Sequence, residues 1–236
     1  MGYGRTLRMV VKHPMVLLEQ RHTESVPSVR QKNFAEFFAG IGLIRMGLER
    51  QGWSLAFAND IEPQKYAMYA DQFGAADQHF ALGDVHQLTA EQLPTVTLAT
   101  ASFPCNDLSL AGSRGGLSGK ESSAFWGFMR LLDDLGMRKP PLVLLENVTG
   151  FLSSRQGDDF TAALVALNEL GYSVDTFILD AARFVPQSRQ RLFVVGVLDR
   201  VQGVRETLTP YRFFEGDTRP KALANFIFTH PDTESA

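Results

Sequence analysis

The chain contains a single cysteine, Cys105, in the segment Ser102-Phe103-Pro104-Cys105-Asn106. An isolated cysteine is most often a small buried hydrophobic residue. Cys105, however, comes after an apolar run, Val96 to Ala101, and begins a segment that is rich in glycine and serine up to Gly119. A thiol in such a polar loop beyond a strand can be exposed and ionised, and the thiolate is a nucleophile. Cys105 is therefore a candidate catalytic nucleophile.

A carboxyl group also follows an apolar run, since Glu146-Asn147-Val148 comes directly after Leu142–Leu145. Partial burial at the end of a strand favours the protonated form of a carboxyl group, so Glu146 could donate a proton at neutral pH. A helix cap or a salt bridge in a loop is the ordinary alternative.

Two arginines precede the last apolar run, in the segment Gln187-Ser188-Arg189-Gln190-Arg191. Side chains alternate along a strand, so the sequence predicts Gln187, Arg189 and Arg191 on one side of the start of a strand. The alternative to a role in a site is a solvated basic edge.

Three successive apolar runs end in residues that suit an adenosine-type cofactor. The first ends in the turn Phe38-Ala39-Gly40-Ile41-Gly42, whose glycines allow the backbone to approach a ligand. The second ends in Asp60 and the third in Asp84. A carboxylate after the second strand can accept hydrogen bonds from two ribose hydroxyls, and one after the third can accept from an adenine amino group.

Each of these features alone has a common explanation. A glycine turn joins many strands to helices, Asp60 could cap its helix, and Asp84 could be a solvated loop acid. Arg45 occupies the third glycine position of the phosphate-binding pattern G-x-G-x-x-G, which argues against NAD. A cofactor without a pyrophosphate is favoured, and S-adenosylmethionine fits.

Apolar periodicity places these residues on alternating strands and helices. We predict strands over 34–38, 53–58, 80–82, 96–101, 141–145, 172–179 and 192–198. Helical spacing is found over 43–52, 63–73, 122–135 and 157–170. The alternation predicts an α/β fold with a largely parallel, doubly wound sheet, in which ligands bind beyond the carboxyl ends of the strands.

The composition is that of a soluble globular chain. The length of 236 residues allows one α/β domain, no apolar run reaches the roughly 18–20 residues of a membrane span, and one cysteine favours a reducing cytoplasm. The formal net charge is −3, but residues 1–32 contribute +4, so the rest of the chain carries −7. A domain that gripped a phosphate backbone alone would be basic, so any affinity for nucleic acid must be local or come from elsewhere.

The ordered series of the glycine turn, Pro104-Cys105, Glu146-Asn147-Val148 and Gln187-x-Arg189-x-Arg191 resembles the DNA (cytosine-5) methyltransferase family. Asn59-Asp60 and Gly83-Asp84 match as well, and the resemblance extends over residues 34–198. It implies a Rossmann-like S-adenosylmethionine-dependent methyltransferase fold whose mostly parallel sheet ends in an antiparallel strand pair. It also implies methyl transfer from S-adenosylmethionine to carbon 5 of cytosine in DNA.

The resemblance implies a catalytic role for four residues. Cys105 would add to carbon 6 of a flipped-out cytosine, while Glu146 would hold the ring N3 and the exocyclic amine. Arg191 would reach the cytosine O2, and Arg189 would support the site.

The resemblance also implies a set of residues around S-adenosylmethionine, which are Phe38, Gly40, Gly42, Asp60, Ile61, Asp84 and Pro104. Ile61 stands where an aromatic residue can stack on adenine, which predicts a modest affinity for the cofactor. We expect no metal and no membrane partner.

Beyond Asp199 the periodic pattern fades, and nothing resembles the late motif of the family. We therefore expect a poorly ordered tail over 1–32, a catalytic domain over 33–200, and over 201–236 the start of a linker toward a target-recognition region. The chain would be a fragment, or one subunit of a split enzyme whose C-terminal partner chain carries that region, in a restriction–modification or related DNA-marking system.

Two other functions stay open. A tRNA cytosine-5 methyltransferase shares the catalytic motifs. A non-catalytic partner subunit would share the fold, although a scaffold has no need of Cys105, Glu146 and Arg191 together.

Overall fold

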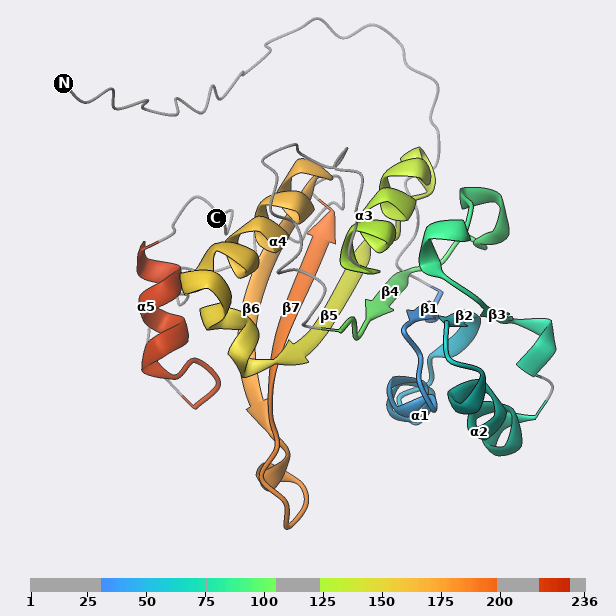
Figure 1. Cartoon of the computed structure of the whole chain (residues 1–236), viewed down its shortest axis with the longest axis horizontal. Coiled ribbons are helices and arrows are strands. Elements are labelled where there is room, and N and C mark those ends of the chain that lie inside the picture. Colours follow the sequence, from blue (N-terminus) through green and yellow to red (C-terminus); the bar gives the residue numbers. More distant parts are fainter. Residues whose placement is uncertain (1–30, 75, 105–123, 199–216, 230–236) are drawn as a thin grey trace, which may run out of the picture.

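Seven strands form one mixed sheet in the computed structural model, which describes residues 31–74, 76–104, 124–198 and 217–229 (Figure 1). Neighbouring strands follow the order β3-β2-β1-β4-β5-β7-β6. Their bounds lie close to the apolar runs of the sequence. The strands are β1 (Asn33–Phe37), β2 (Ser54–Asp60), β3 (Phe80–Leu82), β4 (Leu98–Ala101), β5 (Leu142–Val148), β6 (Tyr172–Asp180) and β7 (Gln190–Leu198).

The first five strands run parallel to one another, and β7 runs antiparallel between β5 and β6. The predicted α/β fold, with a mostly parallel sheet and an antiparallel final pair, is confirmed. The central strand β4 is buried along its whole length, as expected for a parallel strand that is covered on both faces. Because parallel strands end at one edge of a sheet, the residues that follow β1 to β5 lie along that edge.

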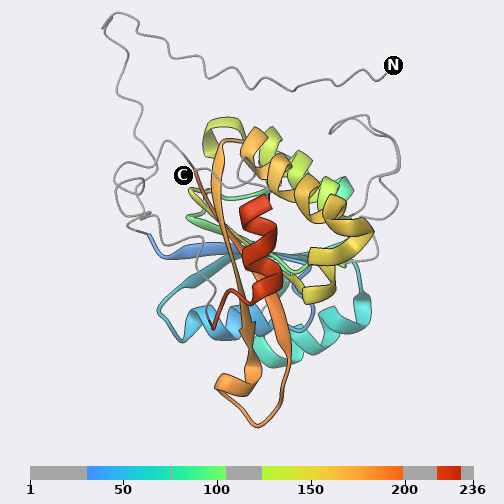
Figure 2. The same ribbon diagram turned by 90° about the vertical axis from the view of Figure 1, so that its left-hand side faces the viewer.

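Helices cover both faces of the sheet (Figure 2). The helices α1 (Leu43–Glu49) and α2 (Pro63–Phe73) lie on one face, and α3 (Ala124–Asp134) and α4 (Asp158–Glu169) lie on the other. The larger core includes Phe37 of β1, whose ring centroid is 4.9 Å from that of Phe128 in α3. A smaller cluster surrounds Tyr69 of α2. None of the described helices is long and apolar enough to cross a membrane.

A segment near the C-terminus pairs with the edge strand β6. The main-chain oxygen of Thr218 accepts a hydrogen bond from the N–H of Ile178 at 2.7 Å. Next to it, Arg219 forms an ion pair with Asp175 of the same strand. These contacts protect part of an otherwise open sheet edge.

The segment continues as α5 (Lys221–Thr229), a helix that the sequence analysis did not predict. Its Phe226 packs on Phe160 of α4, with ring centroids 4.9 Å apart, and its Leu223 and Ile227 are buried in the same core. Figures 1 and 2 show α5 beside α4. The helix α5 is therefore part of the packed domain.

Candidate active site

The turn after β1 contains two glycines that serve different purposes. Gly40 and Gly42 both adopt the left-handed backbone that favours glycine, with φ of 56° and 82°. A Cβ atom on Gly40 would meet no atom within 4 Å, so this side of the turn is open. A Cβ atom on Gly42 would lie 2.3 Å from Cε2 of Phe73 and 2.9 Å from the ring of Tyr69. Gly40 leaves room for a ligand, whereas Gly42 allows α2 to pack against the turn.

Phe38, just before this turn, has a left-handed backbone with φ of 56°. For a bulky side chain this conformation costs roughly 1–2 kcal/mol, and it persists only where surrounding contacts hold it. The next N–H, that of Ala39, donates to the main-chain oxygen of Asn59 at 2.9 Å, and the Phe38 ring packs against the larger core. The strained residue is one that the resemblance to the family implies for the cofactor site.

Asp60 is the buried last residue of β2 and binds the glycine turn. Its Oδ2 accepts from the N–H of Gly40 at 2.8 Å, and its Oδ1 accepts from the N–H of Glu62 at 2.9 Å. Asp60 therefore fixes the turn after β1 relative to the start of α2. A carboxylate oxygen can accept more than one hydrogen bond, so these contacts leave capacity for ribose hydroxyls.

Asn59 fixes a third strand end and was not among the predicted site residues. Its amide donates to the main-chain oxygens of Ala81 and Gly83, at 2.8 and 2.9 Å. The side chain is buried, so it acts on the backbone that leads to Asp84 rather than on a ligand. The sequence did give two signals for this residue, its place at the end of an apolar run and the match of Asn59-Asp60 to the family.

Asp84 shares its edge of the sheet with exposed apolar side chains. It is half-buried, and its Oδ1 accepts from the N–H of His86 at 2.9 Å. Ile41, Ile61 and Leu82, at the ends of β1, β2 and β3, are 41%, 64% and 46% exposed. An open glycine turn, apolar side chains and a nearby acid fit an adenosine-type ligand, which has apolar faces and a polar edge.

Glu146 of β5 and Arg191 of β7 form an ion pair with an Oε1 to Nε distance of 2.8 Å. Val148 pairs with Arg191 across the antiparallel strands, so Glu146 lies diagonally opposite on the same face. The two side chains are 23% and 20% exposed, so both are partly accessible. The structure thus brings together two of the predicted catalytic side chains.

Asn147 connects this pair to the predicted nucleophile segment. It is buried, and its amide donates to the main-chain oxygen of Phe103 at 3.1 Å. Its Oδ1 accepts from the N–H of Val148 at 2.8 Å. Pro104 is exposed directly after this contact. Cys105 itself lies outside the described residues, as does most of the predicted glycine-rich loop.

The expected alternation before β7 was wrong for two of its three residues. The strand begins at Gln190, so only Arg191 lies in it, and Gln187 and Arg189 belong to the connection from β6. Arg189 is exposed, and its N–H donates to Oδ1 of Asp180 at 2.8 Å. This contact holds the shape of the connection next to Arg191.

Comparison with known proteins gives a match over most of the chain. A family model described as C-5 cytosine-specific DNA methylase matches residues 32–232. The Type II methyltransferase M.DsaV of Dactylococcopsis salina is 32% identical over 172 residues, which are 72% of this chain and 47% of that protein. The Type II methyltransferase M.BsuFI of Bacillus subtilis is 30% identical over 201 residues, which are 85% of this chain and 46% of that protein. The chain spans about half the length of these curated relatives.

A solved structure shares the fold. The Dnmt2 methyltransferase of S. pombe superposes with a TM-score of 0.58 at 26% sequence identity. The superposition covers 70% of this chain and 50% of that chain.

Proposed function

Because the chain belongs to the C-5 cytosine-specific DNA methylase family, we propose that it carries the site that methylates carbon 5 of cytosine in DNA. The observation that carries this proposal is the contact between Glu146 and Arg191. It lies at the strand edge where Asn147 also holds Phe103, two residues before Cys105 in the sequence.

Glu146 and Arg191 are proposed to hold the target base through complementary hydrogen bonds. With a proton on its carboxyl group, Glu146 would donate to the ring N3 and accept from the exocyclic amine, and the Arg191 guanidinium would donate to the O2 carbonyl. The proton held between Glu146 and N3 would neutralise the charge that develops on the ring when the thiolate adds. A base that enters beside the pair would replace part of their mutual contact with contacts to itself. A cytosine within a duplex cannot reach these side chains, so it must first be flipped out of the stack.

Cys105 is the proposed nucleophile. Its thiolate would add to carbon 6 of the cytosine and form a C–S bond, which converts carbon 5 into a nucleophilic enamine carbon. S-adenosylmethionine, when bound, supplies the methyl group that carbon 5 takes up. A base then removes the carbon 5 proton, the C–S bond breaks, and the thiolate is released together with 5-methylcytosine.

Proteins of this family use S-adenosylmethionine. In this chain we expect Asp60 to accept from the ribose hydroxyls and Asp84 to accept from the adenine amino group. The remaining proposed contacts surround the open side of the glycine turn and come from Phe38, Gly40, Ile61 and Pro104. Gly42 contributes through packing, because its own Cα side is covered by Phe73.

The proposed context is a restriction–modification or related DNA-marking system, because M.DsaV and M.BsuFI are Type II methyltransferases. Residues 33–236 carry a net charge of −7, so we propose that target recognition depends on a further region or on a partner chain. The single cysteine favours a cytoplasmic location.

The test is a trapping experiment with DNA that contains 5-fluorocytosine. Fluorine at carbon 5 cannot leave as a proton does, so we expect the covalent adduct with Cys105 to accumulate in the presence of S-adenosylmethionine. High concentrations of protein and DNA are needed because the affinity for duplex is expected to be weak. The adduct should be visible as a mass shift on the peptide that contains Cys105.

The matched control is Cys105→Ala, which should keep the fold and form no adduct. An adduct of undiminished yield on this variant would contradict the proposed nucleophile. Parallel assays with unmodified DNA and tRNA address the alternative substrate, because labelling of tRNA alone would favour the tRNA methyltransferase.

A further inference from the structure

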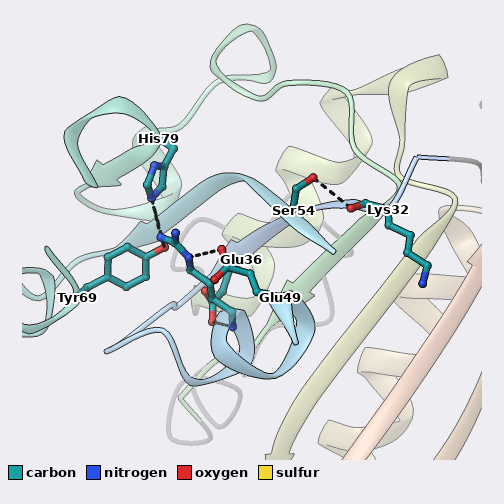
Figure 3. Close-up of polar contacts among 7 residues, drawn as sticks. Lys32, Glu36, Glu49, Ser54, Tyr69 and His79 are labelled. Atoms are coloured by element: carbon teal, nitrogen blue, oxygen red, sulfur yellow. Dashed lines mark hydrogen bonds and ion pairs between the residues drawn. The ribbon is translucent and has the colours of Figure 1, made fainter. Parts of the chain in front are cut away.

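The guanidinium of Arg45, a residue of α1, contacts side chains of α1 itself, of α2 and of the turn before β3. Figure 3 labels three of these partners, Glu49, Tyr69 and His79. Its Nε donates to Oε1 of Glu49 at 2.8 Å, and its Nη1 donates to the Tyr69 hydroxyl at 2.9 Å. The same Nη1 lies 3.1 Å from Nε2 of His79. The Cζ atom stacks 3.9 Å from the ring centroid of Phe73. A planar guanidinium that is only 13% exposed and has this many partners fixes their relative positions.

These partners lie on the segments that position the proposed cofactor site. The helix α2, which carries the two aromatic rings, begins three residues after Asp60. His79 directly precedes β3, which leads to Asp84. Arg45 itself lies three residues after Gly42. One side chain therefore connects the elements that follow β1 and β2 with the one that precedes β3.

The rings of Tyr69 and Phe73 also pack against the glycine turn. Tyr69 and Phe73 occupy the space that a Cβ atom on Gly42 would need. The rings therefore lie directly against the backbone of the turn, with no side chain between them.

An N–H group in the first turn of α1 donates to a side chain of β1, because the residue before the helix has no side chain that could accept. Gly42 has no side chain to offer, and Oε1 of Glu36 accepts from the N–H of Arg45 at 3.3 Å. Glu36 is 1% exposed, and within the described part of the chain its Oε2 has no hydrogen-bond partner. Burial raises the pKa of Glu36 to about 8, so at neutral pH the group is mostly protonated.

The contact between Arg45 and His79 requires a neutral imidazole ring. Nε2 must accept, so the proton of the ring must be on Nδ1. Burial, and after it the charge of Arg45, lowers the pKa of His79 from its usual 6.5. The other titratable groups around Arg45 are Glu36, Glu49 and Tyr69. Burial raises the pKa of Glu36 to about 8 and that of Tyr69 to about 12, so Tyr69 stays neutral and Glu36 is mostly neutral at neutral pH and below. Protonation of His79 in acid would place two cations against each other.

We propose that Arg45 is a positioning residue of the cofactor site. Protonation of His79 in acid removes the contact between His79 and Arg45 and so lowers the affinity for the cofactor. The proposal rests on the proposed function, since it assumes that S-adenosylmethionine binds at the glycine turn. Neither residue takes part in a step of the reaction. Both act on the turn and on the strand ends that carry Asp60 and Asp84.

The test is a calorimetric titration of the full chain with S-adenosylmethionine at about pH 7.5 and about pH 5.5. At the higher pH, Arg45→Met should weaken binding about tenfold or more, because several buried contacts to a charged group are lost. Arg50→Met removes an exposed arginine at the end of the same helix and should leave the affinity unchanged. His79→Gln should bind as the unchanged chain does at pH 7.5, because an amide oxygen can accept from Arg45 at either pH.

The pH profile separates positioning from a merely structural role. The unchanged chain should bind more weakly at pH 5.5, and His79→Gln should lose less affinity over the same interval. An equal loss in both proteins, or equal affinities of Arg45→Met and Arg50→Met, would overturn the proposal. If Arg45→Met fails to fold in circular dichroism melts, the His79→Gln profile decides. If the unchanged chain binds no cofactor at either pH, the proposed function fails and this proposal fails with it.

Discussion

Glu36 is a buried carboxyl group whose protonation makes the stability of the fold depend on pH. Burial raises the pKa of Glu36 from 4.5 to about 8, so the folded chain holds a proton that the unfolded chain releases. The free energy of unfolding is therefore lowered by nothing below pH 4.5, by more as the pH rises, and by the full amount above about pH 8. We expect Glu36→Gln to raise the free energy of unfolding by on the order of 2–4 kcal/mol at pH 8 and by little at pH 5.

Urea denaturation of both proteins at the two pH values measures this difference. The matched control is Glu49→Gln, which removes an exposed carboxylate that contacts the Arg45 side chain, whereas Glu36 contacts the backbone N–H of the same residue. Its effect should change little between the two pH values, because Glu49 is exposed and lacks the burial that makes the free energy of Glu36 depend on pH. An equal gain for Glu36→Gln at both pH values would show that the native group is ionised throughout.

Asp60 has a structural role and a proposed role in cofactor binding, and one substitution should affect both. Its carboxylate accepts from the N–H groups of Gly40 and Glu62, and we propose that it also accepts from a ribose. Asp60→Ala should therefore weaken the binding of S-adenosylmethionine by about 1–3 kcal/mol. It should also lower the free energy of unfolding, because the buried N–H groups of Gly40 and Glu62 lose their acceptor. Calorimetry and chemical denaturation measure the two effects. A destabilised variant with full cofactor affinity would leave Asp60 with its structural task alone.

The sequence could predict that Asp60 lies at a strand end, but not that it binds the glycine turn. The alternation of strands and helices places both groups at one edge, whereas a hydrogen bond between residues 20 positions apart depends on the register of β1 against β2. The same limit applies to Arg45, which appeared in the sequence only as a departure from a glycine pattern. Its role depends on where α2 packs, and this is set by Gly42 and two aromatic rings.

At the scale of elements, α5 is the clearest difference between expectation and structure. The segment Lys221–Thr229 is only nine residues long, but it did carry signals of a helix. The polar residues Asp217 to Pro220 precede it, and Leu223, Phe226 and Ile227 have helical spacing, so the helix was overlooked rather than hidden. Its place depends on the edge of the sheet, where Arg219 and Thr218 bind β6. Whether the chain beyond residue 200 also leads into a linker stays a prediction.

The packing of α5 can be tested with one substitution. Phe226 is buried and contacts Phe160, so Phe226→Ala should lower the free energy of unfolding by about 3 kcal/mol. Asn225→Ala, an exposed position on the same helix, should change it by less than about 0.5 kcal/mol. Thermal or urea denaturation compares the two. Equal, small effects would mean that α5 contributes no stability and behaves as a linker would.

The pairing of Glu146 with Arg191 shows why elements could be predicted more easily than the site. Both side chains lie near the ends of strands that the apolar pattern identified. Their contact, however, requires that β7 insert antiparallel between β5 and β6, and that Val148 pair with Arg191. Neither the insertion nor the register follows from periodicity. An antiparallel final pair was expected only from the resemblance to a family, and the insertion of β7 between β5 and β6 was not expected.

For the molecule as a whole, the distribution of charge limits its affinity for duplex DNA. Residues 1–32 carry a net +4, and the remaining residues carry −7. Duplex DNA repels an acidic body, and affinity for phosphates comes from clusters of lysine and arginine. Of the two proposed catalytic cations, Arg191 is already paired with Glu146. The body of the chain is therefore suited to hold a base and a cofactor, and poorly suited to hold a duplex.

We accordingly expect the 236-residue chain alone to bind duplex DNA no more tightly than non-specific association, about 10⁻⁴–10⁻⁶ M at physiological salt. Removal of residues 1–32 should weaken this binding further and flatten its salt dependence, because each lost phosphate contact lowers the slope of log K against log salt by about 0.9. Fluorescence anisotropy of a labelled duplex at several salt concentrations measures both quantities, and S-adenosylmethionine binding by the shortened chain controls for its folding. Methylation of unmodified DNA by the chain alone should be correspondingly slow, and it should rise when a target-recognition region is supplied as a second polypeptide. Tight, sequence-specific binding by residues 33–236 would instead place the recognition surface within the acidic body itself.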